Sequence, residues 1–274
     1  MSAASGTATP IPPLLLVGCG RMGSALLAGW EAEGLSPSVI LDPDPAGAPH
    51  AGNHVVARDA AALPAGFRPA AVILAIKPQM ADAAMAAVAS RIGEAVVLSI
   101  MAGRTLDGLR RALPASAGIV RAMPNTPAAI GRGISVAVAE TCVGAAQRAL
   151  CDRLLRAAGS VAWVEDEALL DPVTAVSGSG PAYVFLLAEL LEAAGRAQGL
   201  PAALARQLAR ETVAGAGALL AASPEDASAL RQAVTSPGGT TQAALSVLMA
   251  EAAWPQALHD AVRAATERAR ALAS

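Results

Sequence analysis

Aromatic side chains and net charge are both scarce in this chain of 274 residues. Phe, Trp and Tyr together make up 2% of it, and the formal net charge at pH 7 is −2. Nucleic-acid-binding surfaces need clusters of Lys and Arg for phosphates, or aromatic rings on which bases stack. The composition therefore predicts that nucleic acid is not a partner.

Cysteine and long hydrophobic runs are scarce too. Cys19, Cys142 and Cys151 form no Cys-x-x-Cys pair and are odd in number, so we expect no disulfide framework, no metal site and a reducing, cytoplasmic location. Arg, Glu, Gly and Pro keep every apolar segment below the ~20 residues that a membrane helix needs, which predicts no membrane partner. Residues 1–13 lack the basic start and apolar core of a signal peptide, and we expect a disordered lead-in there.

Three glycines stand at a spacing that indicates dinucleotide binding. Gly18, Gly20 and Gly23 follow an apolar run, Leu14 to Val17, and open an amphipathic segment. In this fingerprint the first glycine permits a tight turn, the second lets backbone amides reach a pyrophosphate, and the third lets the helix approach the strand. A glycine-rich structural turn is the alternative.

An acidic residue follows at the expected distance. A second apolar run, 38–41, ends at Asp42, 19 residues beyond Gly23. That is close to the spacing of the carboxylate that accepts ribose hydroxyls in dinucleotide-binding domains. The two features together predict a dinucleotide cofactor.

Alternating apolar runs and alanine-rich segments predict an α/β fold, a Rossmann-type doubly wound sheet over residues 14–164. The expected strands are 14–17, 38–41, 71–76, 95–100, 118–122, 133–139 and 160–164. From residue 165 to 274 only helical periodicity remains, punctuated by prolines that suit the first turns of helices. We therefore place a boundary near residue 165, with an all-α domain after it.

One helical segment of this second domain carries no polar side chain. Val213 to Ala222 is apolar on all sides, and such a helix is normally buried all round. It either forms the centre of the domain or packs against another copy of the chain, with Gly215 and Gly217 permitting close contact. We favour a homodimer in which both occur.

The stretch Val234 to Gln242 reads as an anion-binding helix start. Ser236-Pro237 must turn, Gly238-Gly239 leave the backbone bare, and an alanine-rich apolar run follows. Amides at the positive end of a helix favour a carboxylate or phosphate by about 1 kcal/mol. The alternative is that Thr240 or Thr241 merely caps an ordinary helix.

Ligands of open α/β sheets bind at the carboxyl ends of the strands. Lysine and arginine together number 20, and Lys77 is the only lysine, so 19 are arginines. A lone lysine after the strand 71–76 therefore suggests a specific task, although a solvated residue before Pro78 is the alternative. The histidines His50, His54 and His259 lie in no motif, and we expect surface or loop positions for all three.

The chain resembles the pyrroline-5-carboxylate reductases, the enzymes of the last step of proline synthesis, over most of its length. The resemblance rests on five stretches: Gly18-Cys19-Gly20-Arg21-Met22-Gly23, Ala75-Ile76-Lys77-Pro78-Gln79, Arg121 to Pro127, Ala175 to Tyr183 and Val234 to Thr241. It implies reduction of 1-pyrroline-5-carboxylate to L-proline with NADH or NADPH. It also implies an amino-terminal Rossmann domain and a helical carboxy-terminal dimerisation domain, in dimers that can assemble into decamers.

The resemblance also implies the site residues. It places the substrate carboxylate on the loop Ser236 to Thr241 and the Thr241 hydroxyl, as the catalytic group, near the ring nitrogen. The implied substrate-binding residues are Val234, Ser236, Gly238, Gly239, Thr240 and Thr241. The implied cofactor-binding residues are Gly18, Cys19, Gly20, Arg21, Met22, Gly23, Asp42, Ala75, Ile76, Lys77, Ile100, Met101, Ala102 and Asn125.

Two departures from the family pattern bear on details. Asp42-Pro43-Asp44 stands where many members carry small, hydroxylated or basic residues, and two carboxylates would repel a 2′-phosphate, so we predict a preference for NADH. Ala233 stands where relatives often have a polar residue, so we expect one hydrogen bond to cofactor or substrate to be missing.

Three other functions remain open on the sequence alone. β-Hydroxyacid dehydrogenases also join a Rossmann domain to a helical one, but they use a lysine from the helical domain, and this chain has none after Lys77. A reductase of another small imine or ketone that carries a carboxylate fits the same anion site. A non-enzymatic dinucleotide sensor would predict a degraded substrate loop, and residues 236–241 look intact.

Overall fold

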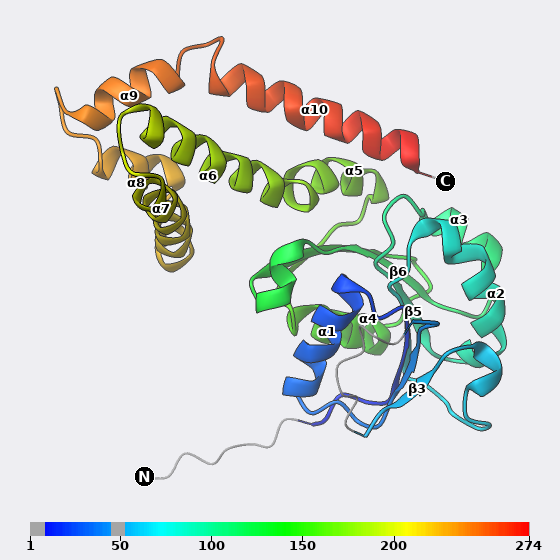
Figure 1. Ribbon diagram of the computed structural model, residues 1–274. Helices are drawn as coiled ribbons and strands as arrows, with labels where there is room; N and C mark the ends of the chain where they lie inside the picture. Colours follow the sequence, from blue (N-terminus) through cyan, green and yellow to red (C-terminus); the bar gives the residue numbers. More distant parts are fainter. Residues whose placement is uncertain (1–8, 45–52, 274) are drawn as a thin grey trace, which may run out of the picture. The chain divides into compact units, whose positions relative to one another are not determined.

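The computed structural model describes residues 9–44 and 53–273 (Figure 1). The chain forms two compact units, which we call the sheet unit (Met1–Gly178 with Thr266–Ser274) and the helical unit (Ser179–Ala265). These units divide at Gly178 and not near residue 165, where the strand signals end. The difference arises because Leu170, which is fully buried, packs with Met123, Val136 and Val138 of the sheet.

An eight-stranded sheet forms the centre of the sheet unit. The strand order is β3-β2-β1-β4-β5-β6-β7-β8. Neighbouring strands are parallel to each other except for the pair β6 and β7, which is antiparallel. The strands are β1 (Leu14–Val17), β2 (Val39–Leu41), β3 (Val55–Ala57), β4 (Ala71–Leu74), β5 (Val96–Ser99), β6 (Ile119–Met123), β7 (Gly133–Ala139) and β8 (Gly159–Trp163). The predicted doubly wound α/β sheet is thereby confirmed.

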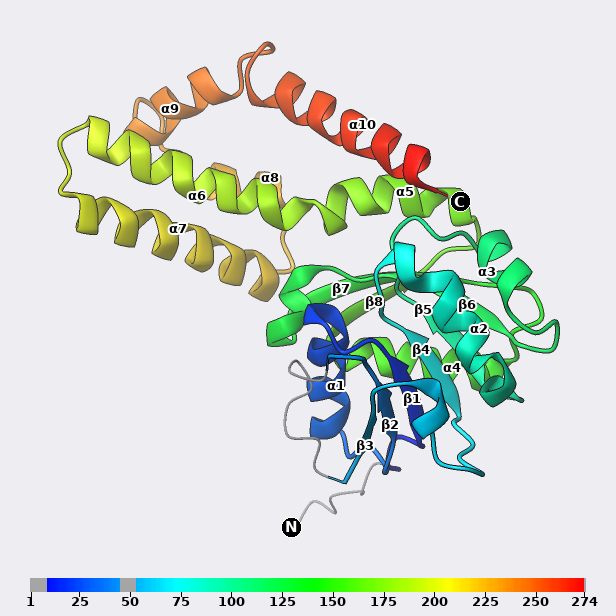
Figure 2. The ribbon, with the colours of Figure 1, turned by 45° about the vertical axis from the view of Figure 1, so that its right-hand side comes forward.

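Helices cover both faces of this sheet (Figure 2). Helices α1 (Arg21–Ala32) and α4 (Ala145–Arg156) share one apolar cluster with the strands, and α2 (Ala81–Ile92) and α3 (Leu106–Ala112) share the other. Strands covered on both faces read as continuous apolar runs, and all four residues of β1 are buried accordingly. Between α1 and α4, Trp30 is fully buried and its Nε1 donates to Leu154 O at 2.7 Å.

Two features of the sheet unit differ from the sequence prediction. Strand β3 was not expected, because Val55 and Val56 are largely exposed on an edge strand and Ala57 alone is buried. The expected lead-in 1–13 is wrong for its last residues, since Ile11 is fully buried and its backbone bonds with Gly34 and Ser36. Residues 1–8 lie outside the described residues.

The carboxy-terminal part is helical, as predicted. From residue 165 to 273 the structure contains no strand, and Pro181 and Pro255 occupy first-turn positions. A short helix α5 (Leu170–Val173) and a π-helical turn, Thr174–Gly178, lead out of the sheet unit. The longer helices are α6 (Gly180–Ala197), α7 (Ala202–Ala222), α8 (Ala227–Ala233), α9 (Thr240–Leu248) and α10 (Trp254–Leu272), of which α6 and α7 lie side by side (Figure 2).

Helices α6 and α7 leave much of their apolar surface exposed. Leu219 and Leu220 of α7 are 56% and 50% exposed, and Phe185 of α6 is 63% exposed. The expectation that Val213 to Ala222 is buried within its own domain is therefore wrong, and packing against a second copy remains. By length and composition, the stretch Glu167–Ala197 would suffice to cross a membrane, but the π-helical turn interrupts its α-helical structure.

We predict that Trp30→Phe lowers the free energy of unfolding by about 1–3 kcal/mol, because it leaves the buried Leu154 carbonyl without its donor. Chemical denaturation monitored by far-UV circular dichroism measures this change. Trp163→Phe is the matched control: Trp163 Nε1 donates to Asp152 Oδ1 at 2.9 Å, and water can solvate that carboxylate instead. An equal loss in both variants would contradict the assignment of the cost to Leu154.

Candidate active site

The glycine turn after β1 is built on two close backbone approaches. Gly18 has φ +91°, and a Cβ there would lie 2.6 Å from Ile76 Cγ2 and 2.7 Å from Ala75 O. A Cβ on Gly23 would overlap Gly18 O, so α1 can lie this near to the turn only with glycine. Gly20 is different, because, apart from its chain neighbours, no atom of the described residues lies within 4 Å of a Cβ built on it. Gly18 and Gly23 therefore pack closely against neighbouring atoms, whereas the turn leaves open space beside Gly20.

Asp42 joins this turn to the end of β2. Its Oδ2 accepts the Cys19 amide at 2.6 Å, and its Oδ1 accepts the Asp44 amide at 2.9 Å. The carboxylate therefore holds the glycine turn in place and stands where the fingerprint expects the ribose-binding acid. Arg58, which follows β3, is exposed.

The other expected cofactor residues from β4 and β5 lie at the same edge of the sheet. Ala75 N donates to Val17 O at 2.8 Å, and Ile100 N donates to Leu74 O at 3.0 Å. Ala102 and Lys77 are exposed, whereas Met101 is buried. The loop after β5 is linked to the loop after β4 through Arg104, which donates to Pro78 O at 3.2 Å.

Asn125, the last expected cofactor residue, follows β6 and has a different set of partners. Its Oδ1 accepts the Ile134 amide at 2.9 Å, and its Nδ2 donates to Ser177 O at 3.1 Å. The side chain thus connects the loop after β6 to β7 and to the π-helical turn. Arg21 and Met22, in the first turn of α1, complete the expected set.

Cys19 is buried beneath the turn, with 1% of its surface exposed. Burial, together with the nearby carboxylates of Asp42 and Glu31, raises the pKa of its thiol to about 11. The thiol is therefore protonated at neutral pH and unreactive. Of the other two cysteines, Cys142 is exposed and Cys151 is buried.

The expected substrate loop lies in the helical unit, ahead of α9. Gly238 has φ +72°, and Gly239 occupies the position before the first helical residue without a side-chain cap. The Gly238 amide donates to Gln242 Oε1 at 2.5 Å, and the Gly239 amide donates to Ser236 O at 3.0 Å. These two amides are therefore already paired within the loop.

The three amides of the first turn of α9 remain open. No acceptor within the described residues bonds the amides of Thr240, Thr241 or Gln242. Thr241 is half-buried, while Val234, Ser236 and Thr240 are exposed. The open donors thus begin at Thr240, two residues later than Gly238.

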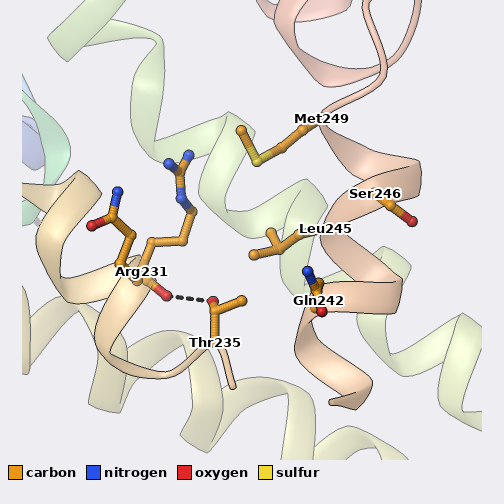
Figure 3. A pocket seen from close by; sticks show the side chains of 7 residues that line it. Arg231, Thr235, Gln242, Leu245, Ser246 and Met249 are labelled. Atoms are coloured by element: carbon orange, nitrogen blue, oxygen red, sulfur yellow. Dashed lines mark hydrogen bonds between the residues drawn. The ribbon is translucent and has the colours of Figure 1, made fainter. Parts of the chain in front are cut away.

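A hollow of about 300 Å³ lies beside this loop, between α8 and α9 (Figure 3). Arg231, Leu245 and Met249 point into it, and Thr235 Oγ1 donates to Arg231 O at 2.6 Å. Sequence reasoning assigned no role to Arg231. The Arg231 guanidinium forms no ion pair or hydrogen bond with the residues that the structure describes.

Two supporting residues escaped the sequence analysis. Gln242 occupies the third position of α9, where a Gln can reach back to a preceding amide, and this capping signal was readable. The Glu167 carboxylate accepts hydrogen bonds from the buried Arg121 guanidinium at 2.7 Å and from the Leu106 amide at 2.8 Å. No local sequence pattern predicts the contacts of Glu167, because Arg121 and Leu106 lie 46 and 61 residues away from it.

The expectations for metals and histidines have separate outcomes. Among residues 9–44 and 53–273, no group of three His, Cys, Asp or Glu side chains is placed to hold a metal. His54 lies in the loop before β3, as expected; its side chain is 5% exposed, and Nδ1 accepts the Ser38 amide at 3.0 Å. His259 is exposed, and His50 lies outside the described residues.

Comparison with known families finds two matches along the chain. Residues 167–272 match the model for pyrroline-5-carboxylate reductase dimerisation. Residues 14–103 match the model for NADP oxidoreductase, coenzyme F420-dependent. The first match contains the loop before α9, and the second contains the glycine turn and Asp42.

Individual relatives extend over nearly the whole chain. Pyrroline-5-carboxylate reductase from Pseudomonas aeruginosa is 36% identical and covers 96% of this chain and 97% of its own length. The structure of a pyrroline-5-carboxylate reductase from Coxiella burnetii superposes with a TM-score of 0.88 at 30% identity, over 96% of this chain and 99% of that one. Plasmodium falciparum pyrroline carboxylate reductase with NADP bound superposes with a TM-score of 0.82 at 26% identity, over 97% and 100%. The chain therefore belongs to the pyrroline-5-carboxylate reductase family.

Proposed function

We propose that this protein reduces the cyclic imine of 1-pyrroline-5-carboxylate to L-proline with NADH, and that the start of α9 holds the substrate carboxylate. Membership of the family makes the chain an NAD(P)-dependent oxidoreductase of this reaction. The choice of NADH and the residue assignments are the finer parts of the proposal. These parts rest on two observations: the unpaired amides in the first turn of α9, and the position of Asp42 at the end of β2, where it bonds to the glycine turn.

The residues at the glycine turn fit a dinucleotide. The empty space above Gly20 suits a pyrophosphate approaching the amino end of α1, where the helix dipole favours negative charge. Arg21, Met22, Ala75, Ile76 and Lys77 would line this edge, with Ile100, Met101 and Ala102 beside them. When bound, the nicotinamide supplies a hydride.

The start of α9 supports the carboxylate assignment. The amides of Thr240, Thr241 and Gln242 form a positive helix end that nothing in the described chain caps. A carboxylate bound there would accept hydrogen bonds from these amides. Because the acceptor is charged, each of these hydrogen bonds contributes about 1.5–3 kcal/mol. Gly238 and Gly239 contribute shape more than donors, since their amides are already paired.

The chemistry asks little of acid–base groups. A protonated imine is already electrophilic, so the protein mainly has to orient the reactants and exclude water. The Thr241 hydroxyl at the same helix start is the group that we assign to the ring nitrogen. His54, whose Nδ1 is bonded to Ser38, is not needed for this scheme.

The exposed apolar faces of α6 and α7, within the segment that matches the dimerisation model, support self-association. We propose a homodimer that can assemble further, up to a decamer. We also propose a cytoplasmic location, which suits a chain whose three cysteines are odd in number and form no Cys-x-x-Cys pair. Nucleic acid and membrane have no part in this proposal.

The proposal is tested by following the nicotinamide absorbance of NADH and NADPH with purified protein and 1-pyrroline-5-carboxylate. We expect oxidation of the cofactor that requires the imine. Folded protein that binds dinucleotide but shows no turnover would refute the proline assignment and point to a reductase of another small carboxylate.

We predict that Gly20→Ala weakens NADH binding at least tenfold, about 1.4 kcal/mol, because its methyl group would fill the space proposed for the pyrophosphate. The fluorescence of bound NADH measures the dissociation constant. Gly144→Ala is the matched control: Gly144 also precedes a helix with no atom within 4 Å of a built Cβ. Unchanged affinity in Gly20→Ala would exclude the proposed pyrophosphate position.

We predict that the natural protein prefers NADH, and that Asp42→Ser shifts the ratio of kcat/KM for NADPH over NADH upward by at least tenfold. Removing a carboxylate next to the 2′-phosphate position reduces charge repulsion there. The kinetics of the two cofactors measure the ratio, with the exposed Asp107, replaced by Ser, as the control. A natural preference for NADPH would contradict the reading of Asp42.

We predict that Thr241→Ala lowers kcat/KM for 1-pyrroline-5-carboxylate about tenfold to a hundredfold, roughly 1.4 to 2.8 kcal/mol in the barrier. The loss follows from removing a hydroxyl that bonds the ring nitrogen. Ser246→Ala removes a hydroxyl from the middle of the same helix, where it donates to Ala243 O, and serves as the comparison. Steady-state rates identical to those of the natural protein would remove Thr241 from the mechanism.

A further inference from the structure

The loop after β6 leaves a backbone donor of β7 without its ladder partner. The antiparallel register pairs Met123 with Val136, so Asn125 stands opposite Ile134 if the ladder continues. Glu140 N donates to Ile119 O in this ladder, and counting in steps of two makes Asn125 and Ile134 a hydrogen-bonded pair. However, the chain turns after Pro124, and Asn125 O accepts the Ala128 amide instead, at 3.1 Å. The Ile134 amide therefore needs another acceptor.

The π-helical turn leaves a backbone acceptor unpaired for a different reason. An α-helical carbonyl accepts the amide four residues later, and for Ser177 that residue is Pro181, which has no N–H. The next donor, Ala182 N, goes to Ser179 O at 2.9 Å. Ser177 O therefore needs a donor from elsewhere in the chain.

The Asn125 side chain satisfies both groups at once. Its Oδ1 accepts the Ile134 amide at 2.9 Å and its Nδ2 donates to Ser177 O at 3.1 Å. The backbone partners are a fixed donor and a fixed acceptor, so they define which end of the carboxamide is oxygen. Asp would repel the Ser177 carbonyl, and no smaller residue reaches both partners.

We propose that Asn125 is a positioning residue for the reaction and not a ligand of the cofactor. The loop Met123 to Asn125 follows β6, which pairs in parallel with β5, so it lies beside Ile100 and Met101, which the proposed function assigns to the cofactor. The two hydrogen bonds of Asn125 hold this loop to β7 and to the turn Thr174–Gly178. The inference rests on the proposed function for its kinetic part only. The contact with Ser177 fixes the last residues of the sheet unit directly ahead of α6.

The test compares Asn125→Ala with Asn125→Asp in the full-length protein. Asp keeps the acceptor for Ile134 but loses the donor for Ser177, while Ala loses both. We expect kcat to fall about tenfold or more in both variants, with the NADH dissociation constant and the KM for 1-pyrroline-5-carboxylate each within about threefold of the natural values. Amide hydrogen exchange at Ile134, followed by NMR, should accelerate in Asn125→Ala and stay slow in Asn125→Asp.

Asn53→Ala is the control, because Asn53 is exposed and precedes β3, at the opposite edge of the sheet. A tenfold weaker NADH affinity with unchanged kcat would make Asn125 a cofactor ligand and overturn the proposal. Unchanged kcat in Asn125→Ala would also overturn it. If the natural protein fails to reduce 1-pyrroline-5-carboxylate, the proposed function fails, whereas unaltered Ile134 exchange in Asn125→Ala would refute the hydrogen-bond tie independently.

Discussion

The arrangement of the sheet edge at which β1, β2 and β4 end depends on how closely α1 approaches the turn after β1. The Gly18 carbonyl lies where a side chain on residue 23 would stand, and Gly18 itself lies against the backbone of Ala75. Because these contacts are between backbone atoms, no rotamer change relieves a clash there. The same approach brings the amino end of α1 to the carboxyl ends of β1 and β4. The positive end of the helix dipole and the loops after these strands therefore lie at the same position.

A second theme is the use of scarce polar side chains to pair backbone groups where regular structure breaks off. Only 15% of the residues are charged, yet Asp42 accepts two loop amides, Glu167 accepts the first amide of α3, and Gln242 accepts the amide of Gly238. A typical intramolecular hydrogen bond contributes about 0.5–1.5 kcal/mol to stability. Each of these side chains therefore holds a loop in one conformation without a large apolar contact.

Much of the fold was predictable from sequence because its signals are local. β1 and β7 have the predicted bounds, since continuous apolar runs mark strands covered on both faces. The apolar run of edge strand β3 is only three residues long, Val55–Ala57, and two of the three are exposed. The burial of Ile11 depends on backbone bonds to residues more than 20 positions away. At the site, spacing predicted the positions of Gly18, Gly20 and Gly23, but no spacing predicts that Asn125 reaches Ser177.

The helical unit also illustrates why an apolar helix can be read correctly and placed wrongly. Val213 to Ala222 carries no polar side chain, but within one chain its surface meets mostly solvent. In the proposed homodimer, the exposed leucines of α6 and α7 become buried against the second copy. The folded state is then linked by mass action to association, so the apparent melting temperature of this protein rises with its own concentration, as it does not for a self-contained monomer.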